Sequence, residues 1–336
     1  MDWWRDIALV TKGATVYRRT GVTPDYAYQS LIRLFCRSRG YSNDILAWLL
    51  RINRSLVALP NANGVLGDLI STDLARIVSQ LREDGYYIFP QLLPADTCDR
   101  LLKFALTAPC AASPPPASPP SRAIYDRHHP VAETYRFTED VLLGNSDVQQ
   151  LASDYSILAL AQTYLAAPPI LDIVTMWWST TFNATASADA AQLYHFDMDR
   201  IKWLKFFFYL TDVTPRTGPH CFVAKSHKRN GQPPHLLKRR YARIPDADIE
   251  QNYPADDIKE IAGPRGTMFV ADTRAFHKGK PLEEGDRLIL QFEFCNSLFG
   301  GMYTKTRLKG GCHPHFRGTI GKYKQIYSKF TLDTDQ

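Results

Sequence analysis

The stretch "QLYHFDMDRIKWLKFFFYL" (residues 192–210) sets three ionisable side chains beside a run of large apolar ones. His195, Asp197 and Asp199 stand at every second position, so in an extended segment they share one face. The segment "WLKFFFYL" that follows them predicts a buried strand. Imidazole and carboxylate groups need partners when they are buried, and a metal ion is a partner that both can bind. The stretch therefore predicts a metal site on a β-structure.

Strand-like segments dominate the chain from about residue 168 to residue 298. Sequences typical of turns separate them, at 215–218, 263–266 and 283–285. Many short strands at close spacing predict a sandwich or a barrel, and helical periodicity prevails before them. We therefore expect a mainly β protein with flanking helices, divided into an N-terminal helical extension (1–65), a core domain (66–300) that contains a proline-rich loop (109–122), and a basic C-terminal tail (301–336).

The composition describes a folded protein with a modest positive charge. Of the 336 residues, 45% are apolar and 12% aromatic, and the net charge is +6, too small to predict nucleic-acid binding without a clustered patch. The six cysteines form no CxxC pair, which favours reduced thiols in an intracellular protein. The first residues lack the pattern of a secretory signal, and no run of 18 apolar residues predicts a membrane span. We expect a soluble, cytoplasmic protein.

Two further residues of the β-region extend the hypothesis of a metal site. His277 follows the turn "GPRGT" and a strand-like segment, and Arg287 lies ten residues later. Two imidazoles and one carboxylate can occupy one face of an octahedral Fe(II) ion and leave three positions open for a chelating cosubstrate and dioxygen. An arginine on an adjacent strand offers a planar fork to a carboxylate, such as the remote carboxylate of 2-oxoglutarate.

These segments also carry a resemblance to a known family. The sequences "YHFDMDRIKWLKFFFYLTDVTPRTGPHCFVAKSHKR" (194–229) and "GPRGTMFVADTRAFHKGKPLEEGDRLILQFEF" (263–294) are similar to the phytanoyl-CoA dioxygenase family. The segment "DGYYIFPQLLPADTCDRL" (84–101) also resembles the usual entry to that family's core. The resemblance implies a double-stranded β-helix of the jelly-roll or cupin type, an Fe(II) cofactor, and 2-oxoglutarate and O2 as cosubstrates.

Residue roles follow from the resemblance. It implies His195, Asp197 and His277 as iron ligands and Arg287 as the clamp on 2-oxoglutarate. It also assigns cosubstrate contacts to two further positions, Gln192 and Tyr209. The chain departs from the family in "AKSHK" (224–228), where Lys225 stands in place of a glycine and puts the local turn in doubt.

Five residues near the first ligands are substrate candidates. Asp199 could compete with Asp197 as the ligand or contact substrate, and Arg200 could contact substrate or form an ion pair with Asp199. Lys205 shares the parity of Tyr209, so if that side chain points inward, Lys205 does too and should meet an acid, the cosubstrate or a substrate anion. The alternative is a lysine at the strand edge that reaches solvent. The adjacent Trp177 and Trp178 must point to opposite faces of their strand, and the sequence leaves open which of them lines a pocket.

The expected activity is hydroxylation of an unactivated C–H bond in a small-molecule, lipid or glycan-type substrate, with release of succinate and CO2. Desaturation or ring closure would use the same residues. The basic loop 225–243 either attracts an anionic substrate or is a solvated surface loop. Two alternatives remain: a catalytically silent jelly-roll binding protein, and a membrane-associated accessory protein anchored by the basic helices of residues 1–60. The remaining histidines are expected to lie on the surface or in loops, outside the site: His128, His129, His220, His227, His235, His313 and His315.

Overall fold

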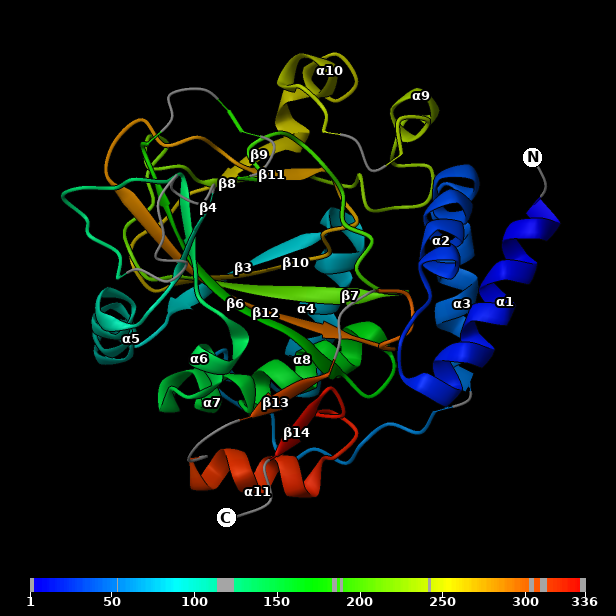
Figure 1. Cartoon of the computed structure of the whole chain (residues 1–336), viewed down its shortest axis with the longest axis horizontal. Coiled ribbons are helices and arrows are strands. Elements are labelled where there is room, and N and C mark those ends of the chain that lie inside the picture. The colour runs from blue at the N-terminus through cyan, green and yellow to red at the C-terminus, as the bar shows by residue number, and fades with distance from the viewer. Residues whose placement is uncertain are drawn as a thin grey trace.

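A sheet of seven antiparallel strands forms the centre of the molecule in the computed structural model (Figure 1). The structure describes residues 3–52, 54–113, 124–182, 186–187, 190–240, 243–301, 305–308 and 313–332. Most of the predicted proline-rich loop lies outside these residues. The strands follow the order β3 (Tyr86–Leu92), β10 (Thr267–Ala271), β7 (Trp203–Tyr209), β12 (Asp286–Cys295), β6 (Ile170–Thr180), β5 (Thr134–Arg136) and β4 (Ala111–Ser113).

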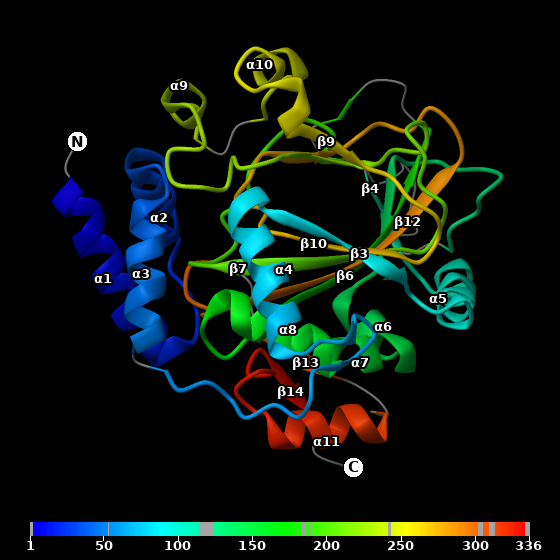
Figure 2. The same cartoon turned by 180° about the vertical axis from the view of Figure 1, so that it is seen from behind.

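A second sheet of three antiparallel strands faces the large one. Its order is β11 (His277–Gly279), β8 (His220–Val223) and β9 (Ile258–Ile261). Figures 1 and 2 both place these strands on the same side of the large sheet. Aromatic side chains fill part of the space between the sheets, with Phe207 stacked on Phe269 at 4.7 Å between ring centroids. Every residue of β7 is buried because both faces of this strand are covered.

Helices cover the other face of the large sheet. They are α4 (Ser71–Asp84), α5 (Ala95–Thr107), α6 (Glu139–Leu143), α7 (Ser146–Ala152), α8 (Tyr155–Leu165) and α11 (Pro314–Lys322). Gly85 ends α4, since this residue has a left-handed φ of 88° and its N–H is donated to the Leu81 carbonyl. Strand alternation decides which side chains lie on each face of the large sheet. Even-numbered residues of β7 and β12 pack on the helices, and odd-numbered ones face the small sheet.

The described residues 305–308 and 313–332 pack on the core. Strands β13 (Thr306–Leu308) and β14 (Phe330–Leu332) pair in parallel beside α11. Phe316 and Tyr327 are buried in the same apolar cluster as the helices of the large sheet. The Lys329 ammonium forms an ion pair with Glu139 at 3.0 Å. Burial of apolar side chains therefore holds this segment on the core domain.

Three N-terminal helices form one flank of the molecule (Figures 1 and 2): α1 (Trp3–Thr20), α2 (Asp25–Ser38) and α3 (Tyr41–Ile52). Asp6 is buried between Arg33 and Arg37 at 2.7 Å from each. The Asn43 amide donates to the Ile201 carbonyl, and Asp44 forms an ion pair with Arg274. These contacts dock the helical extension on the core.

The smaller elements complete the described chain. They are the β1–β2 pair (Asn63–Gly64 with Gly67–Asp68), the short helices α9 (Pro234–Leu237) and α10 (Asp246–Glu250), and a 3-10 turn (Ala255–Asp257). The five cysteines in the described part of the chain are free thiols, as expected. Within that same part, no helix combines the length and the hydropathy that a membrane span requires.

Candidate metal centre

From its alternation we had expected the segment that carries His195 and Asp197 to be a regular strand. It is not one in the structure. Only isolated bridges form here, between Tyr194 and Ile244 and between His195 and His277. In the second bridge each main-chain N–H is donated to the other residue's carbonyl, at 3.0 and 2.8 Å. The alternation still has the expected effect, because this short extended segment turns His195, Asp197 and Asp199 into one cavity. The bridge to β11 brings His277 to the same place.

Main-chain carbonyls orient both imidazoles. His195 Nδ1 lies 2.9 Å from the Leu193 carbonyl and His277 Nδ1 lies 2.9 Å from the Ala275 carbonyl. A carbonyl can only accept, so each Nδ1 carries a hydrogen, and in the neutral ring Nε2 is then the nitrogen with the lone pair. The two Nε2 atoms lie 3.8 and 3.4 Å from the two carboxylate oxygens of Asp197. Ligand atoms of these three residues all lie within 4.8 Å of one another, a spacing that suits a single ion.

The charges of the three side chains also suit a cation. Burial lowers the pKa of His195 to about 3, and the neighbouring His277 adds to this effect. Burial alone would raise the pKa of Asp197, but the Lys205 ammonium and the two histidines hold it well below its usual range. The site therefore offers neutral imidazole and an ionised carboxylate, the protonation states that metal binding requires.

Lys205 points into the cavity and meets acids, which confirms the expectation for this residue. Its ammonium lies 2.6 Å from Asp197 Oδ2, 2.8 Å from Asp199 Oδ2 and 3.4 Å from Glu293 Oε2. Burial raises the pKa of Glu293 well above its usual value, and the nearby Asp199 carboxylate adds to this. Lys205 thus compensates the carboxylates of the cavity. The geometry favours Asp197 over Asp199 as the ligand, because only Asp197 belongs to the compact three-residue group.

A cavity of about 480 Å³ contains this group and lies between the two sheets. Arg287 lies on its wall, on β12, and is only 4% exposed. One guanidinium nitrogen donates to Ser179 Oγ at 3.1 Å, and Nε and Nη1 have no partner among the described residues. Gly279 makes room for the group, since an added Cβ there would lie 3.2 Å from the guanidinium. A buried guanidinium with unused donors is a ready site for a carboxylate.

The two other predicted cosubstrate contacts do not line the cavity. The Tyr209 hydroxyl donates to the Ile261 carbonyl at 2.7 Å and accepts the His220 N–H, so neighbouring strands already satisfy it. Phe207, two residues earlier on the same face of β7, lines the cavity instead. The side-chain oxygen Oε1 of Gln192 accepts the Ser187 N–H at 2.8 Å, so it already has a partner.

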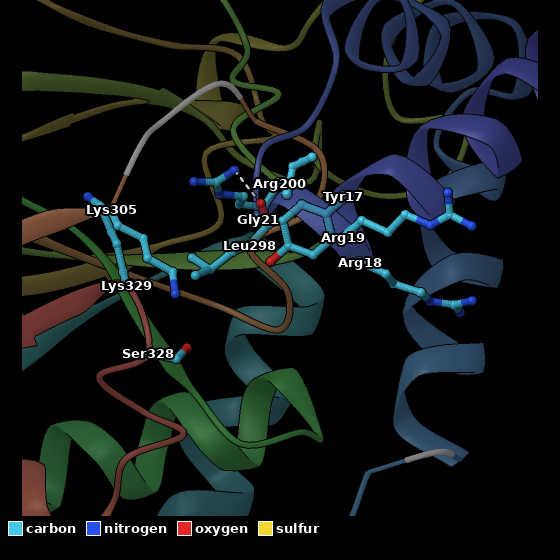
Figure 3. Close-up of a pocket in the computed structure, with 10 residues that line it drawn as sticks. Tyr17, Arg18, Arg19, Gly21, Arg200, Leu298, Lys305, Ser328 and Lys329 are labelled. Carbon is cyan, nitrogen blue, oxygen red and sulfur yellow. Dashed lines mark hydrogen bonds between the residues drawn. The ribbon is translucent and has the colours of Figure 1, made fainter.

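Two of the substrate candidates lie outside the cavity. The Arg200 guanidinium donates to both oxygens of Asp172, at 2.5 and 2.9 Å. It borders a different pocket of about 510 Å³, between the end of α1 and Lys305 (Figure 3). Trp178 packs among the helices and donates its N–H to the Ala105 carbonyl. Its neighbour Trp177 lines the cavity, with the Arg136 guanidinium 5.9 Å from the centre of the ring.

Three residues of the cavity were missed from the sequence. His220 was expected to lie in a loop, but it is a buried residue of β8 and its ring centroid lies 5.5 Å from that of His277. Burial holds the pKa of His220 well below its usual value. Arg136 and Arg243 also line the cavity. The one available signal was parity, because His220 and Phe222 share a face of a short apolar strand.

The basic loop 225–243 is largely compensated by neighbouring acids. Its ion pairs are Lys225–Asp257, Lys228–Glu83, Arg229–Asp44 and Arg239–Asp248. Lys225 has a left-handed φ of 67°, at the position where the family resemblance implies a glycine. The backbone of Lys225 therefore has the left-handed conformation that glycine adopts easily, and this conformation is strained for lysine. Of the seven lysines and arginines predicted to form a basic patch here, Arg243 is the one that lines the cavity.

Comparison with known proteins identifies the family. The model of the phytanoyl-CoA dioxygenase (PhyH) family matches residues 81–287, more than half of the chain. The chain belongs to this family, and its cavity holds the His–Asp–His ligand set of an iron- and 2-oxoglutarate-dependent enzyme. No curated protein matches the chain.

Solved structures of low sequence identity are also similar to it. The epimerase SnoN in complex with Fe3+, alpha ketoglutarate and nogalamycin RO is 19% identical, with 68% of this chain and 85% of that chain covered and a TM-score of 0.48. HygX from Streptomyces hygroscopicus with nickel and 2-oxoglutarate is 17% identical, with coverages of 70% and 91% and a TM-score of 0.49. The carbocyclase SnoK from nogalamycin biosynthesis is 13% identical, with coverages of 73% and 90% and a TM-score of 0.48.

Proposed function

We propose that this protein is an Fe(II)- and 2-oxoglutarate-dependent dioxygenase that hydroxylates an unactivated C–H bond of a small organic substrate. The observation that carries the proposal is that one cavity contains both the His195–Asp197–His277 group and the Arg287 guanidinium, whose Nε and Nη1 have no hydrogen-bond partner among the described residues. A structural metal site would explain the first feature but not the second. A silent jelly-roll binding protein is therefore the weaker alternative.

Each residue of the cavity has a separate task in this proposal. His195, Asp197 and His277 would hold the iron, with the imidazoles locked by the Leu193 and Ala275 carbonyls. Arg287, steadied by Ser179, would bind the remote carboxylate of 2-oxoglutarate through its free N–H groups. Phe207 would form an apolar wall beside the cosubstrate.

The bound iron would supply the oxidising chemistry, with 2-oxoglutarate, O2 and R–H giving succinate, CO2 and R–OH. The chain's own contribution is to bind, to orient and to exclude water. Lys205 holds Asp197 and Asp199 in place and balances their charge, since its ammonium is within 2.8 Å of both. Trp177 and Arg136 lie on the cavity wall where they could contact a substrate.

The sheet arrangement supports the finer fold expected from the sequence. We propose that the seven- and three-stranded sheets are the two halves of a double-stranded β-helix, with the metal centre between them. The core domain is proposed to span residues 66–300, preceded by the helical extension. A cytoplasmic location remains a prediction, with which the free thiols are compatible.

Succinate formation from 2-oxoglutarate tests the activity without knowledge of the substrate. Purified protein is supplied with Fe(II), ascorbate, O2 and 2-oxoglutarate, and succinate is measured in the absence of substrate, where slow uncoupled turnover is expected. His277→Ala should abolish turnover, and His235→Ala, a replacement of an exposed histidine, should leave it unchanged. Equal turnover by all three proteins would overturn the proposal.

A further inference from the structure

The exposed face of α3 is apolar, the reverse of what a helix on a protein surface normally shows. The exposed residues of this helix are Tyr41, Ile45, Trp48, Leu49, Arg51 and Ile52, so five of the six are large and apolar. Ile45, Trp48 and Ile52 are 56%, 57% and 59% exposed. They recur at intervals of three and four residues and thus form a single stripe along the helix. We call this set of five apolar residues the α3 stripe.

An apolar groove continues the α3 stripe toward α1. Its volume is about 410 Å³, and Ile45 and Tyr41 line it from α3 while Trp3 and Ile7 line it from α1. Trp4, the next residue of α1, is 79% exposed. Three tryptophans therefore stand at the surface of one pair of helices. Contiguous apolar surface of this kind marks a site of interaction.

A basic pocket of about 630 Å³ adjoins the α3 stripe on its other side and shares Trp48 with it. Three of its cations, Arg51, Arg82 and Lys202, form no ion pair with any described residue. Lys202 instead donates to the carbonyl of Tyr164, at the C-terminal end of α8. The pocket's single acid, Asp44, already forms ion pairs with Arg229 and Arg274. Positive charge in this pocket is thus uncompensated.

We propose that this flank of the protein docks on the surface of an anionic phospholipid membrane. The α3 stripe and Trp3 would enter the interface, and lipid phosphates would occupy the basic pocket beside Trp48. Tryptophan favours this boundary between headgroup and acyl chain. Arginine and lysine near the surface attract anionic lipid. Charge complementarity selects this occupant over a second copy of the chain, because a two-fold contact through the same face would bring two basic pockets together.

Vesicle co-sedimentation tests the proposal independently of the metal centre. The full-length protein is mixed with vesicles of phosphatidylcholine alone or with 30% phosphatidylglycerol. We expect binding to the anionic vesicles that weakens with added salt. The double variant Trp48→Ser/Ile52→Ser should lose at least tenfold in affinity. The matched control Ile88→Ser/Leu92→Ser removes two apolar side chains of similar exposure on β3 and should bind as the unmodified protein does.

A charge-reversal pair separates the basic pocket from general attraction. Arg51→Glu/Arg82→Glu should abolish the preference for anionic vesicles, whereas Arg317→Glu/Lys324→Glu, an equal change of charge near the C-terminus, should not. Circular dichroism confirms that each variant is folded. Absence of binding to anionic vesicles would overturn the proposal. So would a concentration-dependent dimer, in sedimentation velocity, that Trp48→Ser/Ile52→Ser dissolves, because it would assign the face to a second copy.

Discussion

Two arginines, Arg287 and Arg200, are buried to a similar degree but belong to regions that use a buried positive charge in different ways. Arg200 gives two bonds to Asp172 and one to the Leu298 carbonyl. Burial would lower its pKa, but the Asp172 carboxylate raises it above the usual value. Arg287 has one bond to a hydroxyl, and burial lowers its pKa. The region around Arg200 therefore contains its own counter-charge, whereas the region around Arg287 does not.

This difference teaches how a binding site can be told from a structural ion pair. Leaving a cation buried without a counter-charge is costly, so a fold keeps such an arrangement where something else is gained. Beside Arg287 lies a cavity with a possible metal centre, and a carboxylate ligand would supply the missing charge. Arg200 itself is already paired with Asp172, although the pocket that it borders is also lined by Arg18, Arg19 and Lys305 (Figure 3).

The largest expected effect comes from removing a metal ligand. His277→Ala should weaken Fe(II) binding by more than about 100-fold, because even loss of a residue that only supports a ligand costs 10- to 100-fold. Equilibrium dialysis with iron analysis measures it. His220→Ala is the matched control, since this histidine lines the same cavity outside the three-residue group. Equal losses in both variants would contradict the assignment.

Arg200→Ala should destabilise the protein by about 3–5 kcal/mol, because it leaves the Asp172 carboxylate buried and unpaired. Urea unfolding followed by tryptophan fluorescence measures this. In the double variant Arg200→Ala/Asp172→Ala, the loss of unfolding free energy should be smaller than the sum of the losses in the two single variants. An unchanged unfolding midpoint in Arg200→Ala would show that the pair is not the structural element described.

Arg287→Ala should weaken 2-oxoglutarate binding by about 1.5–3 kcal/mol, roughly 10- to 150-fold, the range for hydrogen bonds to a charged group. Iron binding should be retained, and the folded protein should not lose stability as Arg200→Ala does. Isothermal titration of the iron-loaded protein with 2-oxoglutarate gives the affinity. Arg287→Lys keeps the charge without the planar fork and should be intermediate. A loss of iron binding in Arg287→Ala would contradict the specific role of Arg287 in binding 2-oxoglutarate.

The smallest effect concerns the strained turn. Lys225→Gly should raise the free energy of unfolding by up to about 1 kcal/mol, because a left-handed φ costs an L-residue about 1–2 kcal/mol and glycine offsets part of this gain through its entropy. Lys228→Gly is the control, since Lys228 also has an ion pair but no left-handed φ. It should be neutral or destabilising. Stabilisation of both variants would contradict the role given to strain.

Alternation and spacing were enough to predict the elements of the core and the three-residue group. The strands β6, β7, β8, β10 and β12 all lie in residues 168–298, the region in which strand-like segments were predicted. Parity also showed that Trp177 and Trp178 lie on opposite faces, but it could not say which face the helices cover. That choice depends on packing by α5 and β5, which lie 40 or more residues away.

Partners that are distant in the sequence account for most of the errors. Arg200 pairs with Asp172, 28 residues earlier on β6, and nothing in the sequence around Asp172 indicated that it would be the partner. Tyr209 shares its face of β7 with Phe207, but the carbonyl of β9 and the N–H of β8 already occupy its hydroxyl. The sequence predicted helices in residues 1–65 but could not show that one face of α3 is left uncovered, because helical periodicity shows that a stripe exists and not what covers it.

The most direct test of the account is an anaerobic titration of the apoprotein with Fe(II) and then with 2-oxoglutarate. The account predicts that iron binds and that a weak visible charge-transfer band appears when 2-oxoglutarate is added. Asp197→Ala should lose the band, and Arg287→Ala should require far more 2-oxoglutarate to produce it. If iron binds and no band appears at any concentration of 2-oxoglutarate, the cosubstrate role of Arg287 is contradicted. If no iron binds, the metal centre itself is.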